Sequence, residues 1–287
     1  MVKTLDERIR EDLKDLYNDG KMNGIIDAAV KLNDVIKDKL STKGLPGYFT
    51  GNRNAQTVLV MLNPGQDASV SDNPLTLQEE IKKLKIKTGD FEEFVDSFMT
   101  GKAKFGKLTT NKKDPFDLKQ AEFLRDWDSE LKIPKDFPAD KDTYEKATEE
   151  VLMNKLQLEL IPYCSRKFVL KSKLTDKEKA FLLSYVDTLF EEIFSKKRTY
   201  VIFASAVFEK IFKMLPNVKF EEPKSPREPL KKKDGESSKI NFRCQKITIT
   251  YKGKEHKAMI AHTYPVQFHG DIICQYGKFC YEEYIKS

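Results

Sequence analysis

The stretch Thr57-Val-Leu-Val-Met-Leu62, followed at once by Asn63-Pro64-Gly65, decides the fold predicted for this chain. A short, unbroken apolar run rich in branched residues is typical of a strand that is buried on both faces. Pro64 restricts the residue before it to extended backbone, and Gly65 lets the backbone come close to whatever lies at the strand end. The run therefore predicts a core strand that ends abruptly at a polar turn.

Three further segments have the composition of short core strands, and helical patterns separate them. One of these helices opens at the capping box Thr175-Asp-Lys-Glu178 and is expected to run to about Lys197. Strands separated by long helical stretches are typical of an α/β sandwich. We therefore predict a three-layer α/β sandwich around a central, mostly parallel four-stranded sheet. The further strands are expected at 156–163, 200–204 and 257–261, the last as the second arm of a hairpin that begins at 246–251.

We expect the whole chain, residues 1–287, to form a single α/β domain with three additions to its core. Residues 1–45 carry two amphipathic helices, and residues 75–155 form a mainly helical insertion. Residues 216–257 form a basic loop, rich in proline and lysine, that leads into the hairpin.

The composition excludes several classes of protein. With 39% hydrophobic and 11% aromatic residues, the chain is too apolar to be disordered. The first ten residues are charged where a signal peptide needs an apolar core, and no run approaches the length of a membrane span. We therefore expect a cytoplasmic protein with no membrane partner. The chain has four cysteines, Cys164, Cys244, Cys274 and Cys280. Their spacing is not that of zinc ligands, so they predict neither a metal nor a cofactor.

The net charge of +6 is concentrated in one segment. Between Lys219 and Lys257 there are twelve Lys and Arg against six Asp and Glu, so the rest of the chain is formally neutral. The segment contains Lys231-Lys232-Lys233 and leads directly to His262. Clustered positive charge favours a nucleic-acid phosphate backbone as the partner, although a solvated loop is the simpler interpretation.

The ends of the predicted strands define the candidate site. In an open α/β sheet, ligands bind in the crevice at the carboxyl ends of the strands. The sequence contains neither a glycine-rich phosphate loop nor a nucleophile elbow after any strand. We therefore expect the polar residues at four strand ends to converge, namely Asn63-Pro64-Gly65, Pro162-Tyr163-Cys164, Ala204-Ser205 and His262-Thr-Tyr-Pro265.

Two of these strand ends resemble motifs of the uracil-DNA glycosylase superfamily. Asn63-Pro64-Gly65 is similar to the first motif of its thymine- and mismatch-specific branch, and His262-x-x-Pro265 is similar to the final His-Pro-Ser-Pro motif. The segments 156–168 and 200–212 occupy the places of the second and third core strands, in the family's order. Each matched segment is short, and the four together define the resemblance.

The resemblance implies a DNA glycosylase-like, monofunctional hydrolase that releases a damaged or deaminated base of the uracil type from DNA. Asn63 would orient a water molecule below the sugar carbon, since an amide cannot act as a general base, and His262 would stabilise the departing base. Val266 would wedge into the duplex where the base is flipped out. The other residues expected to contact the base or the nucleic acid are Pro64, Gly65, Gln66, Tyr163, Ser165, Ser205, Pro265, Lys231, Lys232 and Lys233.

Each of these residues also has a simpler structural interpretation. Asn63 can begin an ordinary turn, His262 can be a hydrogen-bonded histidine, and Tyr163 can be a core aromatic residue. The family carries an asparagine on its second strand, where this chain has Glu159. Two alternatives therefore stay open: a non-catalytic nucleic-acid-binding protein of the same fold, and a small-molecule hydrolase that uses the same crevice. The sequence predicts no oligomeric state.

Overall fold

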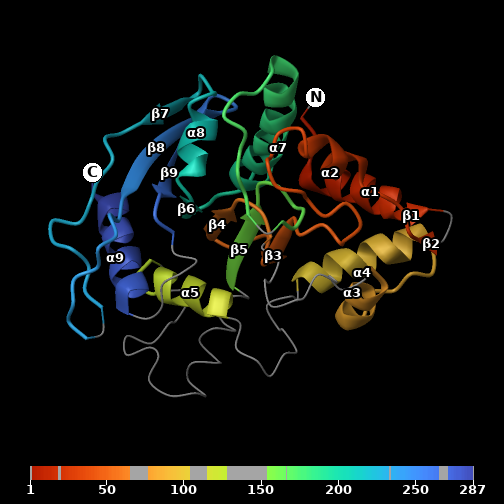
Figure 1. Ribbon diagram of the computed structural model, residues 1–287, viewed down its shortest axis with the longest axis horizontal. Coiled ribbons are helices and arrows are strands. Elements are labelled where there is room, and N and C mark those ends of the chain that lie inside the picture. Colours follow the sequence, from red (N-terminus) through yellow and green to blue (C-terminus); the bar gives the residue numbers. More distant parts are fainter. Residues whose placement is uncertain are drawn as a thin grey trace. The chain divides into compact units, whose positions relative to one another are not determined.

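The computed structural model (Figure 1) combines a mixed β-sheet with helices, which confirms the predicted α/β class. The single domain expected over the whole chain stays a prediction. Two compact units can be distinguished, the first comprising Met1–Thr50, Met61–Phe105 and Leu158–Lys196, and the second comprising Gly51–Val60, Gly106–Gln157 and Lys197–Ser287. The structure describes residues 2–18, 21–64, 77–103, 115–127, 154–165, 167–232, 234–264 and 271–286.

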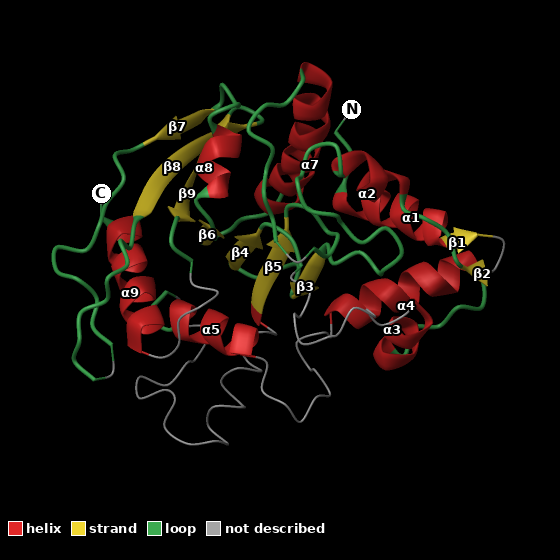
Figure 2. Ribbon diagram, in the orientation of Figure 1, coloured by secondary structure: helices red, strands yellow, loops and turns green. Residues whose placement is uncertain are grey.

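The main sheet of the described residues has seven strands in the order β3-β5-β4-β6-β9-β8-β7, rather than the four that the sequence predicted (Figure 2). The four predicted strands are present as the neighbours β5, β4, β6 and β9. Strands β4 and β5 are buried at every position, as expected for core strands. The bounds are β3 Phe49–Gly51, β4 Thr57–Met61, β5 Lys155–Glu159, β6 Tyr200–Phe203, β7 Val218–Phe220, β8 Cys244–Tyr251 and β9 Lys254–Ala261.

The sheet is mixed because a hairpin extends it. Strands β4 and β6 pair in parallel, as do β6 and β9, whereas β9–β8 and β8–β7 are antiparallel. The predicted hairpin arms are longer than expected, since β8 and β9 pair along their whole length around the turn Lys252-Gly253. Both turn residues have positive φ, which is the backbone that a tight two-residue hairpin requires.

The helices of the first unit follow the predicted amphipathic patterns. A capping box at Thr4 and Glu7 begins α1, and the predicted box at Thr175 and Glu178 begins α7. The two helices expected within residues 1–45 are therefore present, and a short antiparallel pair of strands follows the first. The elements are α1 Leu5–Leu16, β1 Tyr17–Asn18, β2 Lys21–Met22, α2 Asp27–Leu32, α3 Leu77–Leu84, α4 Phe91–Ala103 and α7 Asp176–Phe194.

The second unit contains an aromatic cluster between two helices and the sheet. The ring of Phe123 contacts Tyr276, and Trp127 contacts Tyr200 and Tyr284. A Cβ atom at Gly277 would lie 1.9 Å from the carbonyl oxygen of Phe123, so only glycine permits this close approach. These residues fill the core. The helices of this unit are α5 Pro115–Leu124, α8 Val207–Phe212 and α9 Asp271–Ile285.

Within the insertion predicted at 75–155, the described residues form α3, α4 and α5, with a loop at 85–90 between α3 and α4, and Lys155 already begins β5. The first residue of α5 is Pro115, a residue type that suits the first position of a helix. The remaining parts of the insertion, 75–76, 104–114 and 128–153, lie outside the described residues. Across the described part of the chain, no helix has the length and apolar character that crossing a membrane requires.

Candidate functional site

Asn63 lies in the first unit, two residues beyond the end of β4, and its amide is held by three acceptors. Its Nδ2 atom donates to the carbonyl oxygens of Pro64 (3.1 Å) and Tyr163 (3.2 Å) and to Ser165 Oγ (2.9 Å). Because carbonyl oxygens can only accept, these partners require the amide nitrogen at this position. No donor among the described residues reaches Oδ1. Asn63 therefore keeps a fixed acceptor that can orient a water molecule.

The turn that carries Asn63 is packed against two neighbouring segments of the first unit. Ser165 donates its backbone N–H to the Pro64 carbonyl (3.3 Å), and Gly47 donates to the Pro162 carbonyl (2.6 Å). A Cβ atom at Gly47 would lie 2.6 Å from Pro64 Cγ, so the turn and Gly47 are in close contact. The sharp Asn-Pro turn is therefore held from both sides.

Tyr163 and Ser165 support Asn63 from within the protein. The Tyr163 side chain is only 1% exposed, and its hydroxyl donates to Asp12 Oδ2 at 2.7 Å. Ser165 is 2% exposed. The expectation that the Tyr163 ring contacts a base is therefore replaced by the core interpretation, since a buried ring offers no face for stacking. What both residues provide is an acceptor for Asn63.

His262 lies in the second unit, directly after β9, and is fixed by backbone bonds to two other segments. Its N–H donates to the Arg243 carbonyl (3.1 Å), and its carbonyl accepts from Ala206 (3.2 Å) at the start of α8. The first bond continues the β8–β9 register by one residue, which makes Arg243 the cross-strand neighbour of His262. The end of β9 is thereby attached to both β8 and α8.

The His262 side chain is 5% exposed and faces charged groups. Its Nε2 atom is 3.5 Å from Glu209 Oε2 and forms no hydrogen bond with a described residue. Burial lowers the pKa of His262, the Glu209 carboxylate opposes this shift, and the charges of Arg243 and Lys213 add to it. The hydrogen bond from Lys213 (2.6 Å) in turn lowers the pKa of Glu209. At neutral pH the imidazole is therefore neutral and keeps one N–H donor.

The other predicted contacts are distributed over both units. Ser205, in the second unit, accepts from the Val207 N–H (3.1 Å) at the start of α8. Lys232 is ion-paired with Glu236 (2.9 Å), which raises its pKa, and Lys231 is exposed. The predicted contacts Gly65, Gln66, Lys233, Pro265 and Val266 lie outside the described residues.

The structure thus brings Asn63 together with Pro64, Tyr163 and Ser165, whereas Ser205, Lys231, Lys232 and His262 belong to the second unit. Sequence reasoning missed three residues that touch these groups. Arg243 lies three residues before the predicted hairpin arm at 246–251, so only the observed β8–β9 register makes it the neighbour of His262. Asp12 lies one turn after Arg8 on the apolar face of α1. Two charged residues on an apolar helix face are unusual, and the sequence pattern shows them. The only sequence signal for Glu209 was that it lies four residues before Lys213. Such a pair is equally typical of the solvated face of a helix.

The described residues give no sign of a metal centre. Within the ranges that the structure covers, no three His, Cys, Asp or Glu side chains gather as metal ligands do. All four cysteines are described, and no disulfide joins any of them.

Comparisons with protein-family models, with curated proteins and with solved structures found no match to this chain. The function proposed below is therefore based on the chain's own residues. Those residues are the fixed amide of Asn63, the neutral imidazole of His262 and the basic segment that precedes it.

Proposed function

We propose that this protein is a DNA glycosylase-like hydrolase that releases a damaged or deaminated base of the uracil type from DNA. The observation that carries the proposal is the geometry of the Asn63 amide. Its nitrogen is bound by three acceptors, so the carbonyl oxygen is the atom left to bind a water molecule. Holding a water in one orientation is the contribution that an amide, which cannot accept a proton, can make to hydrolysis.

The order of the strands supports the proposed fold. Of the four strands predicted from the sequence, β4 comes first in the chain, β5 lies on one side of it, and β6 and β9 lie on the other side. The direction of connection therefore reverses at the β4–β6 pair, and ligands of open α/β sheets bind at the carboxyl ends of the strands at such a point. We take these four strands as the glycosylase-like core and the remaining strands as additions to it. Asn63 follows the first of the two strands, and Ser205 follows the second.

The proposed reaction is hydrolysis of the bond between the sugar carbon and the base nitrogen. The base leaves with the electron pair of that bond, the water oxygen bonds to the sugar carbon, and the proton of the water ends on the base. Asn63 orients the water, and the neutral imidazole of His262 donates a hydrogen bond to the base as it becomes anionic. The basic segment between Lys219 and Lys257 provides charge for the phosphate backbone.

Cleavage of a labelled duplex that contains a single uracil tests this function. The duplex is incubated with the protein and then treated with alkali, which breaks the strand wherever a base has been released. We expect strand scission with the wild-type protein and with Asn54→Ala, which alters an exposed asparagine, but not with Asn63→Ala. Scission no greater than that of Asn63→Ala, across uracil, hypoxanthine and thymine mismatches, contradicts the proposal for those bases.

One observation favours a non-catalytic nucleic-acid-binding protein instead. The Glu209 carboxylate lies 3.5 Å from His262 Nε2, and a negative charge at this position opposes an anionic leaving group. Lys213 and Arg243 offset that charge in part. Salt-sensitive DNA binding in a band-shift titration, combined with the absence of base release, would favour this second function.

A further inference from the structure

A buried acid, Asp12, joins three separate segments of the first unit. Asp12 lies on α1 and is only 3% exposed. Its Oδ2 atom accepts hydrogen bonds from the hydroxyls of Tyr48 (2.9 Å) and Tyr163 (2.7 Å). The Tyr163 hydroxyl also lies 3.1 Å from the hydroxyl of Tyr185 on α7. One carboxylate oxygen is therefore the acceptor at the centre of a cluster of three tyrosines.

The ionised carboxylate fixes the direction of every hydrogen bond in this cluster. A carboxylate only accepts, so Tyr48 and Tyr163 must both donate to it. A phenol has one hydroxyl hydrogen, and Tyr163 uses it on Asp12; its oxygen must then accept from Tyr185. A protonated carboxyl group carries a hydrogen-bond donor of its own and is a weaker acceptor. A protonated Asp12 therefore no longer forces the tyrosine hydroxyls to point in these directions.

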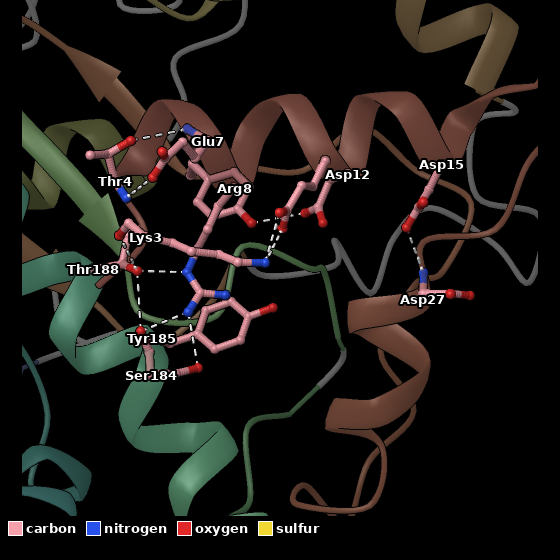
Figure 3. Close-up of polar contacts among 12 residues, drawn as sticks. Lys3, Thr4, Glu7, Arg8, Asp12, Asp15, Asp27, Ser184, Tyr185 and Thr188 are labelled. Carbon is pink, nitrogen blue, oxygen red and sulfur yellow. Dashed lines mark hydrogen bonds and ion pairs between the residues drawn. The ribbon is translucent and has the colours of Figure 1, made fainter. Parts of the chain in front are cut away.

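Arg8 does not neutralise Asp12 by a direct ion pair. Figure 3 shows Arg8 lying over the ring of Tyr185, with its guanidinium directed toward Ser184 and Thr188 of α7. Its Nε atom donates to Thr188 Oγ1 (2.6 Å), and Nη2 donates to both oxygens of Ser184 (2.7 and 2.9 Å). The Arg8 donors are thus used on α7, and the guanidinium carbon lies 4.0 Å from the centre of the Tyr185 ring.

The surroundings of Asp12 place its ionisation near neutral pH. Burial raises the pKa of Asp12 to about 7, while the hydroxyls of Tyr163 and Tyr48 oppose the shift. The charge of Asp15 on the same helix raises the pKa further, and that of Arg8 lowers it. These groups, together with Tyr185, are the titratable and charged side chains that face Asp12 from α1, from α7 and from the two segments that carry Tyr48 and Tyr163.

The same cluster reaches Asn63 through the backbone. The Tyr163 carbonyl accepts from Asn63 Nδ2, and Ser165, two residues further on, accepts from the same nitrogen. Tyr48 follows Gly47, which contacts Pro64. Asp12 therefore holds, through two hydroxyls, the two segments that enclose the Asn63-Pro64 turn.

We propose that Asp12 is a positioning residue for Asn63: its ionised carboxylate orders the tyrosine hydroxyls and the segment 162–165, and its protonation loosens the Asn63 amide. One consequence of this inference rests on the proposed function: Asn63 orients the water for hydrolysis only when Asp12 is ionised. The positioning itself is a property of the first unit and can be measured without a substrate.

The test follows the side-chain amide signals of Asn63 by nuclear magnetic resonance, assigned by their loss in Asn63→Ala. In the wild-type protein these signals should shift with a midpoint near pH 7, the pKa of Asp12. The shift should be absent in Asp12→Asn and also in Tyr163→Phe, which keeps the backbone carbonyl but removes the hydroxyl. Glu11→Gln removes an exposed acid from the same helix and should leave the shift unchanged.

Two outcomes overturn the inference: signals that do not respond to pH in the wild-type protein, or a response that persists in Tyr163→Phe. Tyr163→Phe keeps the test decisive if Asp12→Asn fails to fold. If the wild-type protein releases uracil, kcat should also rise through about pH 7, and Tyr163→Phe should flatten this rise. If the Asn63 amide signals depend on pH but no base is released, the proposed function is rejected and the positioning role of Asp12 stands. If a base is released but the amide signals do not depend on pH, the positioning role is rejected and the proposed function stands.

Discussion

Asn63 and His262 are held in place by different forces. The amide of Asn63 is fixed by three hydrogen bonds, and one of the residues that accept them, Tyr163, donates its hydroxyl to a buried carboxylate. The imidazole of His262 is also buried, yet its Nε2 atom forms no hydrogen bond with a described residue and lies 3.5 Å from the carboxylate of Glu209. The hydrogen bonds around Asn63 fix the orientation of its amide, whereas the charges around His262 adjust the protonation state of its imidazole.

This difference predicts how each region responds to change. Hydrogen bonds depend on direction, so the Asn63 region should be sensitive to small shifts of the backbone and to the loss of a single hydroxyl. Charges act over longer distances, so the His262 region should respond to substitutions that change charge and keep shape.

The largest expected effect concerns Asp12 and the pH dependence of stability. The folded-state pKa of about 7 lies above the unfolded value of 3.8, so between these values the folded chain keeps a proton that the unfolded chain releases. The contribution of Asp12 to stability is therefore fully present below about pH 4 and is lost as pH rises to about 7. The loss amounts to about 4 kcal/mol, since each unit of pKa corresponds to about 1.36 kcal/mol.

Urea unfolding of the wild-type protein and of Asp12→Asn, measured at several pH values, tests this expectation. The free energy of unfolding of the wild-type protein, relative to the variant, should fall by about 4 kcal/mol from about pH 4 to about pH 8. Glu11→Gln serves as the control and should show no such change. A constant difference between wild type and Asp12→Asn would show that the carboxyl group is not protonated on folding.

The second prediction concerns the packing of the Asn63-Pro64 turn. Gly47→Ala places a Cβ atom 2.6 Å from Pro64 Cγ, and a strained contact of this kind costs about 1 to 3 kcal/mol of unfolding free energy. Gly89→Ala is the matched control, because its Cβ meets only the flexible carboxylate of Glu93. Equal stability of the two variants would mean that the turn can move away from Gly47.

The third prediction concerns the charges around His262. Glu209→Gln should lower the pKa of His262 further, since the carboxylate now raises it, and Arg243→Gln should raise it. Titration of the histidine ring signals by nuclear magnetic resonance measures both shifts. His256→Gln identifies the signals of the other described histidine. Movement of the His262 pKa in the same direction in both variants would contradict the proposed electrostatics.

The smallest expected effect concerns the basic segment. Each phosphate contact that is lost should reduce the slope of log affinity against log salt by about 0.9. Lys232 is ion-paired with Glu236, so Lys232→Gln should change DNA binding less than Lys231→Gln does. Binding titrations at several salt concentrations measure both slopes. Unchanged slopes in both variants would identify these lysines as ordinary solvated residues.

The elements that local patterns encode were predictable from the sequence. The buried run at 57–62 and the capping box at Thr175 form the expected strand and helix start, because neighbouring residues determine both. Strands of three residues, such as β3 and β7, carry no periodicity, which is why the sheet is wider than predicted. The hairpin arms were underestimated for a related reason, since the first residues of β9 are exposed and polar.

The candidate site was predictable only in part. Asn63 and His262 were identified by their positions at strand ends, but their partners are distant in sequence: 102 residues separate Asn63 from Ser165, and 151 separate Asp12 from Tyr163. A single sequence carries no signal for pairs at such separations. The burial of Tyr163 was foreseen only as an alternative, because an aromatic residue at a strand end suits a core and a binding site equally well.

The most direct test of the proposed function, which assigns a contribution to Asn63 and another to His262, is the single-turnover rate of uracil release from duplex DNA. The rate is compared among wild type, Asn63→Ala, His262→Ala and the variant that carries both changes. We expect each single change to slow release by about 100-fold or more, and the double variant to lose less than the product of the two losses. Release at the wild-type rate by either single variant would contradict the account.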